Sequence, residues 1–345
     1  MVSSISFSSF VFLVLFSLYC VQLGGDVGIN YGSKGDNLPS PTRVVDFLTK
    51  DLNYSASLIR IFDVNAEVLE ALRGTNLVVT VGVPNDEVPN LASSKEAAIN
   101  WVNHHIKPFV GPNGVRFRYI AVGSELIPGI TSSSVLPAMR NLHKALILTG
   151  LPNYIQVTTI VAINVLGQSY PPSSGEFAPF VARIMKGISN FLYDIGSPLM
   201  INIYPYFSLV LEPDHISLDY ALFESKAPVV RDGPYEYFNL FDAMFDAFLA
   251  AMVKAVGMED VRVVVAQTGW PTEDGEHFSS IENAVVYNNN LKNHARGLGK
   301  TPRMKDLGLE AYIFDMFNEN LQSDPVYRSF GTFYPNFTEV YPLWR

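Results

Sequence analysis

The sequence almost lacks cysteine and has fewer basic than acidic residues. Cys20 is the only cysteine among the 345 residues, so a chain without its N-terminal segment has no thiol, disulfide or thiolate metal ligand. The 24 Lys and Arg against 33 Asp and Glu give a formal net charge of −9. An acidic surface without basic clusters repels phosphate groups, which argues against a nucleic-acid partner. We expect a neutral or small-molecule ligand instead.

The first 25 residues lack charged side chains. They contain the apolar run Phe10–Leu18, which is short for a transmembrane span but typical of the centre of an export signal. The Lys or Arg that usually precedes such a run is absent. We expect residues 1–25 to be a signal peptide and residues 26–345 to be secreted. Two Asn-x-Ser/Thr triplets then predict glycosylation at Asn53 and Asn336.

Apolar runs of strand length alternate with longer helical patterns through the rest of the chain. With 48% apolar residues, one large α/β domain is as consistent with the length as two smaller ones. The valine run before Gly269 and Pro271 is typical of a strand that is buried on both faces. Eight runs are predicted to be strands: Val27–Tyr31, Leu58–Phe62, Leu77–Val83, Tyr119–Gly123, Ile155–Ile163, Leu199–Tyr204, Val261–Gln267 and Leu309–Phe317.

Helical patterns fill most of the gaps between these runs, and Asn65 and Gly257 are placed to cap two of them. Eight strand–helix units predict the α/β class and a single (β/α)8 TIM barrel, with its site at the carboxyl ends of the strands. A doubly wound open sheet is the alternative, but no Gly-rich phosphate loop follows the first strand. The predicted helices are Pro41–Leu52, Ala66–Arg73, Lys95–Phe109, Ser132–Leu148, Ala178–Tyr193, Tyr237–Val256 and Ser279–Gly297.

Polar and aromatic side chains follow the ends of several predicted strands. In a barrel these strand ends converge on one cleft. Carboxylates, amides and phenols without a His pair or Cys suit sugar chemistry better than metal chemistry. Aromatic side chains offer flat faces to pyranose rings, although each is about as often packed in the core or rim. The positions are Asn30, Tyr31, Asp63, Asn85, Asp86, Ser124, Glu125, Tyr170, Tyr204, Tyr206, Phe207, Gln267, Trp270, Glu310, Phe317 and Glu319.

Short motifs occur in a fixed order from about Val27 to the C-terminus. They are GINYG (28–32), NLPSP (37–41), RIFD (60–63), VTVGVPND (79–86), AVGSE (121–125), NIYPYF (202–207), VVVAQTGWPT (263–272) and FNEN (317–320). In this order they resemble the plant endo-1,3-β-glucanases of glycoside hydrolase family 17. The resemblance implies a (β/α)8 barrel with a long open cleft, retaining hydrolysis of β-1,3-glucan, and a location in the apoplast or cell wall.

By this resemblance, Glu125 matches the acid/base residue of the family. Retaining hydrolysis also needs a second carboxyl, about 5 Å away, that attacks the anomeric carbon. The family has Glu at that position, whereas this chain has Gln267 before Thr-Gly-Trp-Pro. A neutral amide is a weak nucleophile and carries no charge to stabilise an oxocarbenium-like transition state. We therefore predict that hydrolysis is slower by several orders of magnitude.

Two further departures accompany Gln267, of which the one at Gln322 is the milder. Ser124 stands where the family has Asn, and its shorter side chain would not hold the 2-hydroxyl of the substrate; Gln322 stands where the family usually has Lys. Tyr204 matches a phenol that bonds the nucleophile. The resemblance implies that the substrate-binding positions are Asn30, Tyr31, Asp63, Ser124, Tyr170, Tyr204, Phe207, Trp270, Glu310, Phe317 and Glu319.

Three functions compete on this scaffold. The first is a β-1,3-glucan hydrolase in which Glu319, Glu310 or Asp63 activates a water for inverting chemistry, which needs carboxyls roughly 6.5–9.5 Å apart. The second is a glucan-binding protein on an inactivated scaffold. The third, transglycosylation, needs the same covalent intermediate and is disfavoured with it. The sequence calls for no metal or organic cofactor, and we expect a monomer without a membrane anchor.

Overall fold

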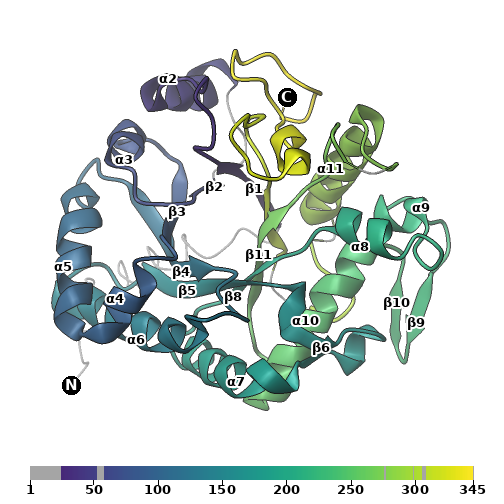
Figure 1. The fold of residues 1–345 in the computed structure, drawn as a ribbon, viewed down its shortest axis with the longest axis horizontal. Helices are drawn as coiled ribbons and strands as arrows, with labels where there is room; N and C mark the ends of the chain where they lie inside the picture. Colours follow the sequence, from purple (N-terminus) through teal and green to yellow (C-terminus); the bar gives the residue numbers. More distant parts are fainter. Residues whose placement is uncertain (1–24, 53–57, 276, 298, 305–307, 345) are drawn as a thin grey trace, which may run out of the picture.

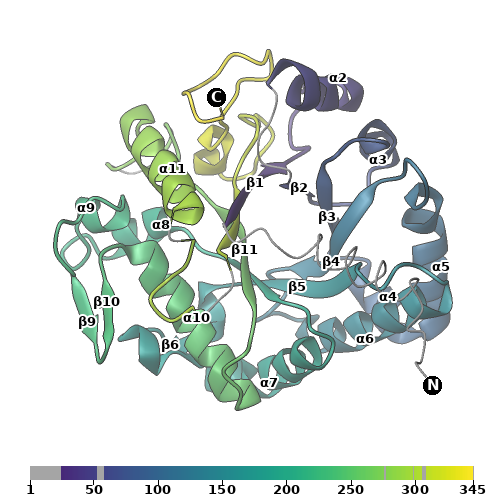
Figure 2. The same cartoon turned by 180° about the vertical axis from the view of Figure 1, so that it is seen from behind.

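Eight parallel strands close into a barrel in the computed structural model, which describes residues 25–52, 58–275, 277–297, 299–304 and 308–344. Neighbouring strands follow the order β1–β12–β11–β8–β5–β4–β3–β2, and β1 pairs with both β12 and β2. The barrel lies inside a ring of helices in both views (Figures 1 and 2). The predicted (β/α)8 barrel is confirmed, and the open-sheet alternative is wrong because the first and last strands pair.

All eight predicted apolar runs form barrel strands. The predicted signal peptide up to Gly24 and the predicted glycosylation site Asn53 lie outside the described residues. The strands are β1 (Asp26–Tyr31), β2 (Leu58–Ile61), β3 (Val78–Val83), β4 (Arg116–Ser124), β5 (Gln156–Ala162), β8 (Leu199–Asn202), β11 (Val263–Thr268) and β12 (Glu310–Ile313).

The helices surround the strands, and their ends follow the predicted caps. The Asn65 side chain accepts hydrogen bonds from two backbone N–H groups of the next turn, and Gly257 ends a helix with a φ of 81°. The helices are α2 (Pro41–Asp46), α3 (Ala66–Leu72), α4 (Val88–Ser93), α5 (Lys95–His105), α6 (Ser132–Leu148), α7 (Pro179–Asp194), α8 (Pro205–Leu211), α9 (Leu218–Ala221), α10 (Leu240–Val256) and α11 (Ile281–Arg296).

Several local features depart from the predicted pattern, including the short helices α4, α8 and α9, which were not predicted. The predicted helix 41–52 changes to a π-helical turn after α2, at Phe47–Asp51. Two hairpins, β6 (Leu166–Gln168) with β7 (Glu176–Phe177) and β9 (Val230–Asp232) with β10 (Tyr235–Tyr237), lie outside the barrel. Their strands are two or three residues long, too short for a periodic signal.

The segment after β12 closes the ring without a long helix. It contains the short 3₁₀ helix Pro325–Ser329 and then packs on α2 and the π-helical turn after it. The Phe337 ring lies 4.6 Å from the Phe47 ring and under the Arg43 guanidinium. This segment is yellow in Figure 1 and lies beside the purple α2. The last unit of the barrel therefore places loop residues at the carboxyl end of the strands.

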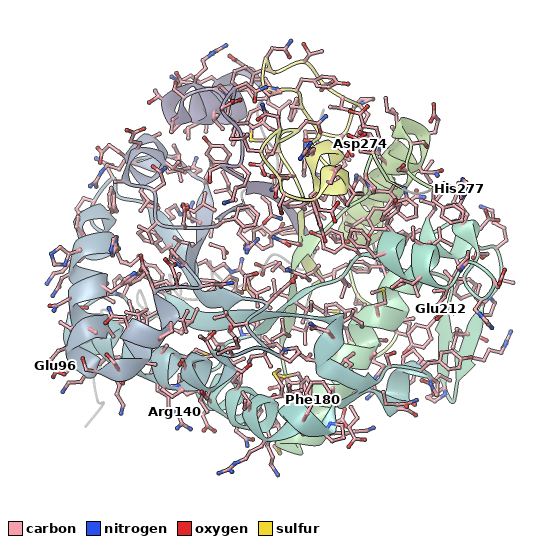
Figure 3. The ribbon with its side chains drawn as sticks, viewed as in Figure 1. Glu96, Arg140, Phe180, Glu212, Asp274 and His277 are labelled. Carbon is pink, nitrogen blue, oxygen red and sulfur yellow. The ribbon has the colours of Figure 1, made fainter. Side chains whose placement is uncertain are left out.

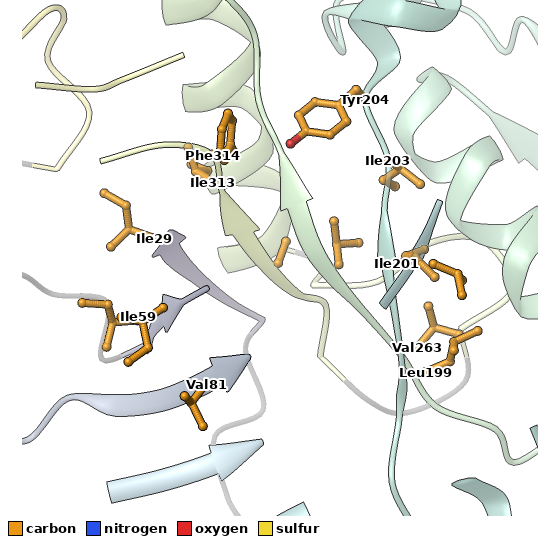
Figure 4. Close-up of a cluster of buried hydrophobic side chains, with 14 of the residues drawn as sticks. Ile29, Ile59, Val81, Leu199, Ile201, Ile203, Tyr204, Val263, Ile313 and Phe314 are labelled. Atoms are coloured by element: carbon orange, nitrogen blue, oxygen red, sulfur yellow. The ribbon is translucent and has the colours of Figure 1, made fainter. Parts of the chain in front are cut away.

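Apolar side chains form two layers, one inside the barrel and one between the strands and the helices. Tyr119, Met200 and Tyr312 belong to the inner layer. Ile59, Ile201 and other side chains of the outer layer are drawn in Figure 4. Each fully buried side chain of this size stabilises the fold by about 1.5–3 kcal/mol. Charged side chains such as Glu96 and Arg140 lie at the periphery of the ring (Figure 3).

Two barrel strands shift register close to their carboxyl ends. The pairing of β11 with β8 shifts between Val265 and Gln267, and the pairing of β4 with β5 shifts between Ala121 and Ser124. Such irregularities redirect side chains. They fall at the two strand ends for which the sequence predicted the acid/base and nucleophile positions. No helix among the described residues is long and apolar enough to cross a membrane.

Candidate active site

Glu125 lies directly after β4 with its side chain exposed to solvent. Its backbone φ is 57°, in the left-handed region that non-glycine residues seldom adopt. The Glu125 N–H donates to the Ile160 carbonyl at 2.9 Å, which anchors the residue to β5. Strained backbone of this kind persists where the surrounding structure fixes it and is common in functional sites. The turn therefore holds the carboxyl group over the mouth of the barrel.

Asn202, the last residue of β8, connects Glu125 with Gln267. Its amide donates to Glu125 Oε1 at 2.6 Å, and it is the register partner of Gln267 across the β8–β11 pair. Asn202 is buried, and its Oδ1 has no hydrogen-bond partner in the protein. The structure thus brings the acid/base and nucleophile positions together. Sequence reasoning missed Asn202, although it begins the NIYPYF motif.

Tyr204 supplies the hydrogen bond at the nucleophile position. Its hydroxyl donates to Gln267 Oε1 at 3.1 Å, as the resemblance implied. Burial raises the pKa of Tyr204 well above its usual range, and the nearby phenol of Tyr327 and carboxyl of Glu125 act in the same direction, so it remains a donor. Figure 4 shows Tyr204 at the carboxyl ends of the strands. Gln267 Oε1 therefore accepts the hydrogen bond that a carboxylate oxygen would accept at this position, but it carries no negative charge.

Arg60 lies beneath these residues and was also missed from the sequence. It is 1% exposed, and its Nη1 donates to Asn30 Oδ1 at 2.6 Å. Burial lowers the pKa of Arg60 to about 10, opposed by the phenols and carboxyls nearby, so the guanidinium stays charged at neutral pH. A signal existed, because an Arg inside an otherwise apolar strand needs partners.

Asn30 does not contact the cleft, so its predicted substrate role is wrong. It is fully buried, and its amide donates to the carbonyl oxygens of Ala266, Tyr312 and Ile313. These bonds join β1 to the ends of β11 and β12. Tyr31 is also buried, at 7% exposed, and its ring lies edge-on to Phe317 at 6.4 Å. Both residues support the site from below.

Two aromatic residues predicted to contact sugar are in the core. Trp270 is fully buried; its indole N–H donates to the Phe278 carbonyl at 2.8 Å and its ring packs 5.3 Å from Tyr206. Phe317 is 1% exposed. Neither can offer a ring face to a sugar, because protein atoms cover both faces. The predictions failed because a turn sequence does not reveal the direction of its side chains.

Other predicted positions keep access to solvent. Tyr170, in the segment between β6 and β7, is 67% exposed, and Phe207 at the start of α8 is half-buried. Asp63 is half-buried after β2, and Ser124 is half-buried at the end of β4. Asn85 exchanges two hydrogen bonds with the Ser124 backbone, at 2.8 and 2.9 Å, and so fixes the loop that carries Glu125.

Glu310 lies at the opposite end of the barrel from Glu125. It is the first residue of β12, whereas Glu125 follows the last residue of β4, and all barrel strands are parallel. Its carboxylate pairs with Arg118 at 2.8 Å and accepts from Tyr312 at 3.2 Å. The prediction that Glu310 binds substrate is therefore wrong. A resemblance in sequence did not show at which end of the strand the residue lies.

Glu319 lies on the cleft side of the barrel but is only 1% exposed. Its Oε1 accepts from the Lys34 N–H and its Oε2 from Gln322 Nε2, both at 2.6 Å. Because its carboxylate is buried, it does not face a substrate or a water in the cleft, so the predicted direct role is wrong. Gln322 instead serves as a neutral partner of Glu319.

The site thus holds one exposed carboxyl, one amide and a buried cation. Glu125 can donate or accept a proton at the mouth of the barrel. Gln267 can orient a sugar hydroxyl but cannot form a glycosyl ester. No group of three or more His, Cys, Asp or Glu within the described part of the chain could hold a metal ion.

Comparisons with known proteins agree with this geometry. The family described as glycosyl hydrolases family 17 matches residues 27–344. A Hordeum vulgare protein named putative glucan endo-1,3-beta-glucosidase GVI is 45% identical over 316 residues, which cover 91% of this chain and 95% of the relative. A Vitis vinifera glucan endo-1,3-beta-glucosidase is 41% identical over 92% of this chain and 91% of its own length.

Solved structures give the same result. CJP38, a beta-1,3-glucanase and allergen of Cryptomeria japonica pollen, superposes with a TM-score of 0.86 at 41% identity, over 92% of this chain and 98% of its own. A structure from a study of two plant beta-glucan endohydrolases with distinct substrate specificities gives the same TM-score and identity. The chain therefore belongs to glycosyl hydrolase family 17 and is an endo-1,3-beta-glucanase homologue.

Proposed function

We propose that this chain is a secreted protein that recognises β-1,3-glucan and whose hydrolysis is strongly impaired. The observation that carries the proposal is Gln267, which accepts the Tyr204 hydrogen bond at the end of β11 where retaining chemistry needs a carboxylate. Each 1.4 kcal/mol of lost transition-state stabilisation slows a reaction about tenfold. Loss of a full charge beside the reacting carbon then removes several orders of magnitude.

Recognition does not require that charge. Tyr170, Phe207 and Glu125 remain accessible, and the amide at position 267 has nearly the shape of a carboxylate. The relatives that carry glucanase names cover this chain almost completely, which supports the same class of polysaccharide as the ligand. We infer that laminari-oligosaccharides bind across the carboxyl end of the barrel.

Two measurements test this function. Titration calorimetry with laminari-oligosaccharides should show saturable binding; no heat and no saturation would refute recognition. Reducing ends released from laminarin should not exceed those of Glu125→Ala, because that variant lacks the acid/base group. Release well above that control would instead support an active hydrolase. Both measurements are repeated with a mixed-linkage β-glucan, so that the two polysaccharides can be compared.

The alternative function is an active inverting hydrolase, and one of the three carboxylates proposed for it is still a candidate. Glu310 lies at the other end of the barrel, and Glu319 is buried away from the cleft. Asp63 is half-buried after β2 and remains the residue to test for inverting chemistry. If wild type releases reducing ends and Asp63→Asn does not, the single-displacement route is correct.

Secretion to the apoplast or cell wall and the monomeric state are part of the proposal. Asn336 is exposed near the C-terminus, where its Oδ1 accepts from the Thr338 N–H at 2.9 Å, so it is accessible to glycosylation. Expression in a secreting plant cell should give a chain whose mass falls on removal of N-linked glycans. Asn336→Gln should lose one glycan, and sedimentation should give the monomer mass.

A further inference from the structure

Asp315 and Glu319 are two buried carboxyl groups that follow β12 at the cleft end of the barrel. Each is 1% exposed. Asp315 Oδ2 lies 2.6 Å, and Glu319 Oε1 lies 2.4 Å, from the point that a Cβ on Gly32 would occupy. Gly32 thus leaves room for the two oxygens to face the same small space, and any side chain there would displace them.

The two carboxyl groups differ in their hydrogen bonds. Both oxygens of Glu319 accept strong bonds, from the Lys34 N–H and from Gln322. Asp315 Oδ1 accepts from the Met316 N–H at 2.6 Å, but no donor meets hydrogen-bond geometry at Asp315 Oδ2. The Gly32 N–H also interacts with Asp315 and lowers its pKa, against the larger effect of burial. A buried acceptor without a donor is costly unless it carries a proton itself.

Electrostatics favours one charge rather than two. Two adjacent buried carboxylates repel each other, so one of them binds a proton. Burial raises the pKa of Asp315 well above its usual range, and the charge of Glu319 adds to this effect. The other titratable groups that interact with Asp315 are Tyr31 from β1, Arg60 from β2 and Tyr204 after β8. The hydrogen-bond pattern places the charge on Glu319 and the proton on Asp315.

The pair also anchors one wall of the site. The Asp315 N–H donates to the Phe330 carbonyl at 3.1 Å, and the Glu319 N–H donates to the Arg328 carbonyl at 3.2 Å. The Phe330 ring packs 5.6 Å from Tyr204, which bonds Gln267. A change of charge in the pair would therefore reach the cleft through a short chain of contacts.

We propose that Asp315 and Glu319 share one proton, carried on Asp315 Oδ2 and donated to Glu319, and that both act as positioning residues for the glucan site. The sharing of the proton stands on the geometry alone, whereas the positioning role rests on the proposed glucan-binding function. When the pair loses its proton, the second negative charge pushes the carboxyl groups apart and moves the wall that carries Phe330.

Infrared difference spectroscopy tests the proton without any ligand. Asp315→Asn should remove one protonated-carboxyl C=O band at about pH 9, where Asp246, with its pKa of about 7, is ionised. Glu319→Gln should weaken that band, because the charge that helps to raise the pKa of Asp315 is gone. Asp274→Asn, at an exposed position, should leave the band in place. A band that persists in Asp315→Asn would overturn the sharing of the proton.

A measurement on the unmutated chain protects the test against variants that fail to fold. With ¹³C-labelled aspartate, one side-chain carboxyl should keep the chemical shift of a protonated acid at about pH 9, above the pKa of about 7 that burial gives Asp246. If every Asp carboxyl is ionised at that pH, the proposal is wrong.

Calorimetry across pH tests the positioning role. Wild-type affinity for a laminari-oligosaccharide should fall about tenfold or more as the pair titrates, while Asp315→Asn should hold its affinity within about twofold, because its amide has no proton to lose. Equal pH profiles would overturn positioning. If no chain binds glucan at any pH, positioning falls with the proposed function, and the infrared result still decides whether the proton is shared.

Discussion

The two ends of the barrel differ in how their buried polar groups are paired. At the amino end, Glu310 is paired with Arg118 and accepts a hydrogen bond from Tyr312. At the carboxyl end, Arg60 Nε and Asn202 Oδ1 are buried without a hydrogen-bond partner, and Asp315 Oδ2 is buried without a donor that meets hydrogen-bond geometry. The buried carboxylate at the amino end is therefore paired within the protein, although Ser197 Oγ just before β8 has no hydrogen-bond partner there, while the carboxyl end keeps several such atoms close together.

This difference separates stability from function. An unpaired buried polar group costs free energy, and native proteins retain few of them. Their gathering around Glu125 and Gln267, beside a residue with strained backbone, is typical of a site that a ligand completes. Gln267 changes the chemistry of that site without changing its architecture.

The largest expected effect comes from restoring charge at the carboxyl end. Gln267→Glu should raise the release of reducing ends from laminarin at least about 100-fold, since removal of a single transition-state contact costs about that much in other enzymes. Gln156→Glu is the matched control, because it adds the same charge at the amino end of β5. Equal activity in the two variants would show that Gln267 does not limit hydrolysis.

The second-largest effect is expected from removing the Glu310–Arg118 ion pair at the amino end. Glu310→Ala leaves Arg118, whose side chain is 34% exposed, without its carboxylate partner, and the free energy of unfolding should fall by about 1–3 kcal/mol. Chemical denaturation measures this loss, and the double variant Arg118→Met/Glu310→Leu should recover most of it. The glucan affinity of the folded chain should not change. An affinity loss without a loss of stability would contradict the assignment of Glu310 to the amino end.

The third effect concerns the hydrogen bond at Gln267. Tyr204→Phe in the wild-type background should lower the free energy of unfolding by about 0.5–1.5 kcal/mol, because the acceptor is neutral. In the Gln267→Glu background the acceptor is charged, and the same change should slow hydrolysis roughly 10- to 100-fold. Tyr334→Phe, at an exposed phenol, controls for removal of a hydroxyl. The free energy of unfolding is measured in both backgrounds. If Tyr204→Phe lowers it by the same amount in each, the charge of the acceptor does not strengthen the hydrogen bond.

The smallest effect tests a buried carboxyl outside both ends. Burial raises the pKa of Asp246 in α10 to about 7, although hydrogen bonds from Thr301 and Tyr237 oppose it. Its contribution to stability is then fully present below about pH 4 and is lost as the pH rises through 7. The Tm of wild type should therefore fall toward that of Asp246→Asn over this range, by about 2–4 °C for each 1 kcal/mol lost. A gap that widens instead would show that Asp246 is ionised when folded.

Most of the fold could be predicted from the sequence, because each strand is a short apolar run that is recognisable from its own residues. Each predicted apolar run became a barrel strand, Asn65 caps the start of α3, and Gly257 caps the end of α10, as expected. The hairpins were missed because two or three residues carry no period.

The candidate site was predicted less completely. Glu125, Tyr204 and Gln267 meet where the motifs implied, but Trp270 and Phe317 are in the core. Arg60, Asn202 and Asp315 were missed, because a polar residue near a strand end does not reveal the partners that other strands bring to it.

By itself the sequence determined that eight strands would form and that no carboxylate would stand at position 267, since side-chain chemistry and short-range periodicity are local properties. Only the tertiary structure decided that Glu310 faces away from the cleft, that Asn202 holds Glu125, and that Asp315 and Glu319 meet beside Gly32. These are contacts between residues far apart in the chain, fixed by closure of the barrel.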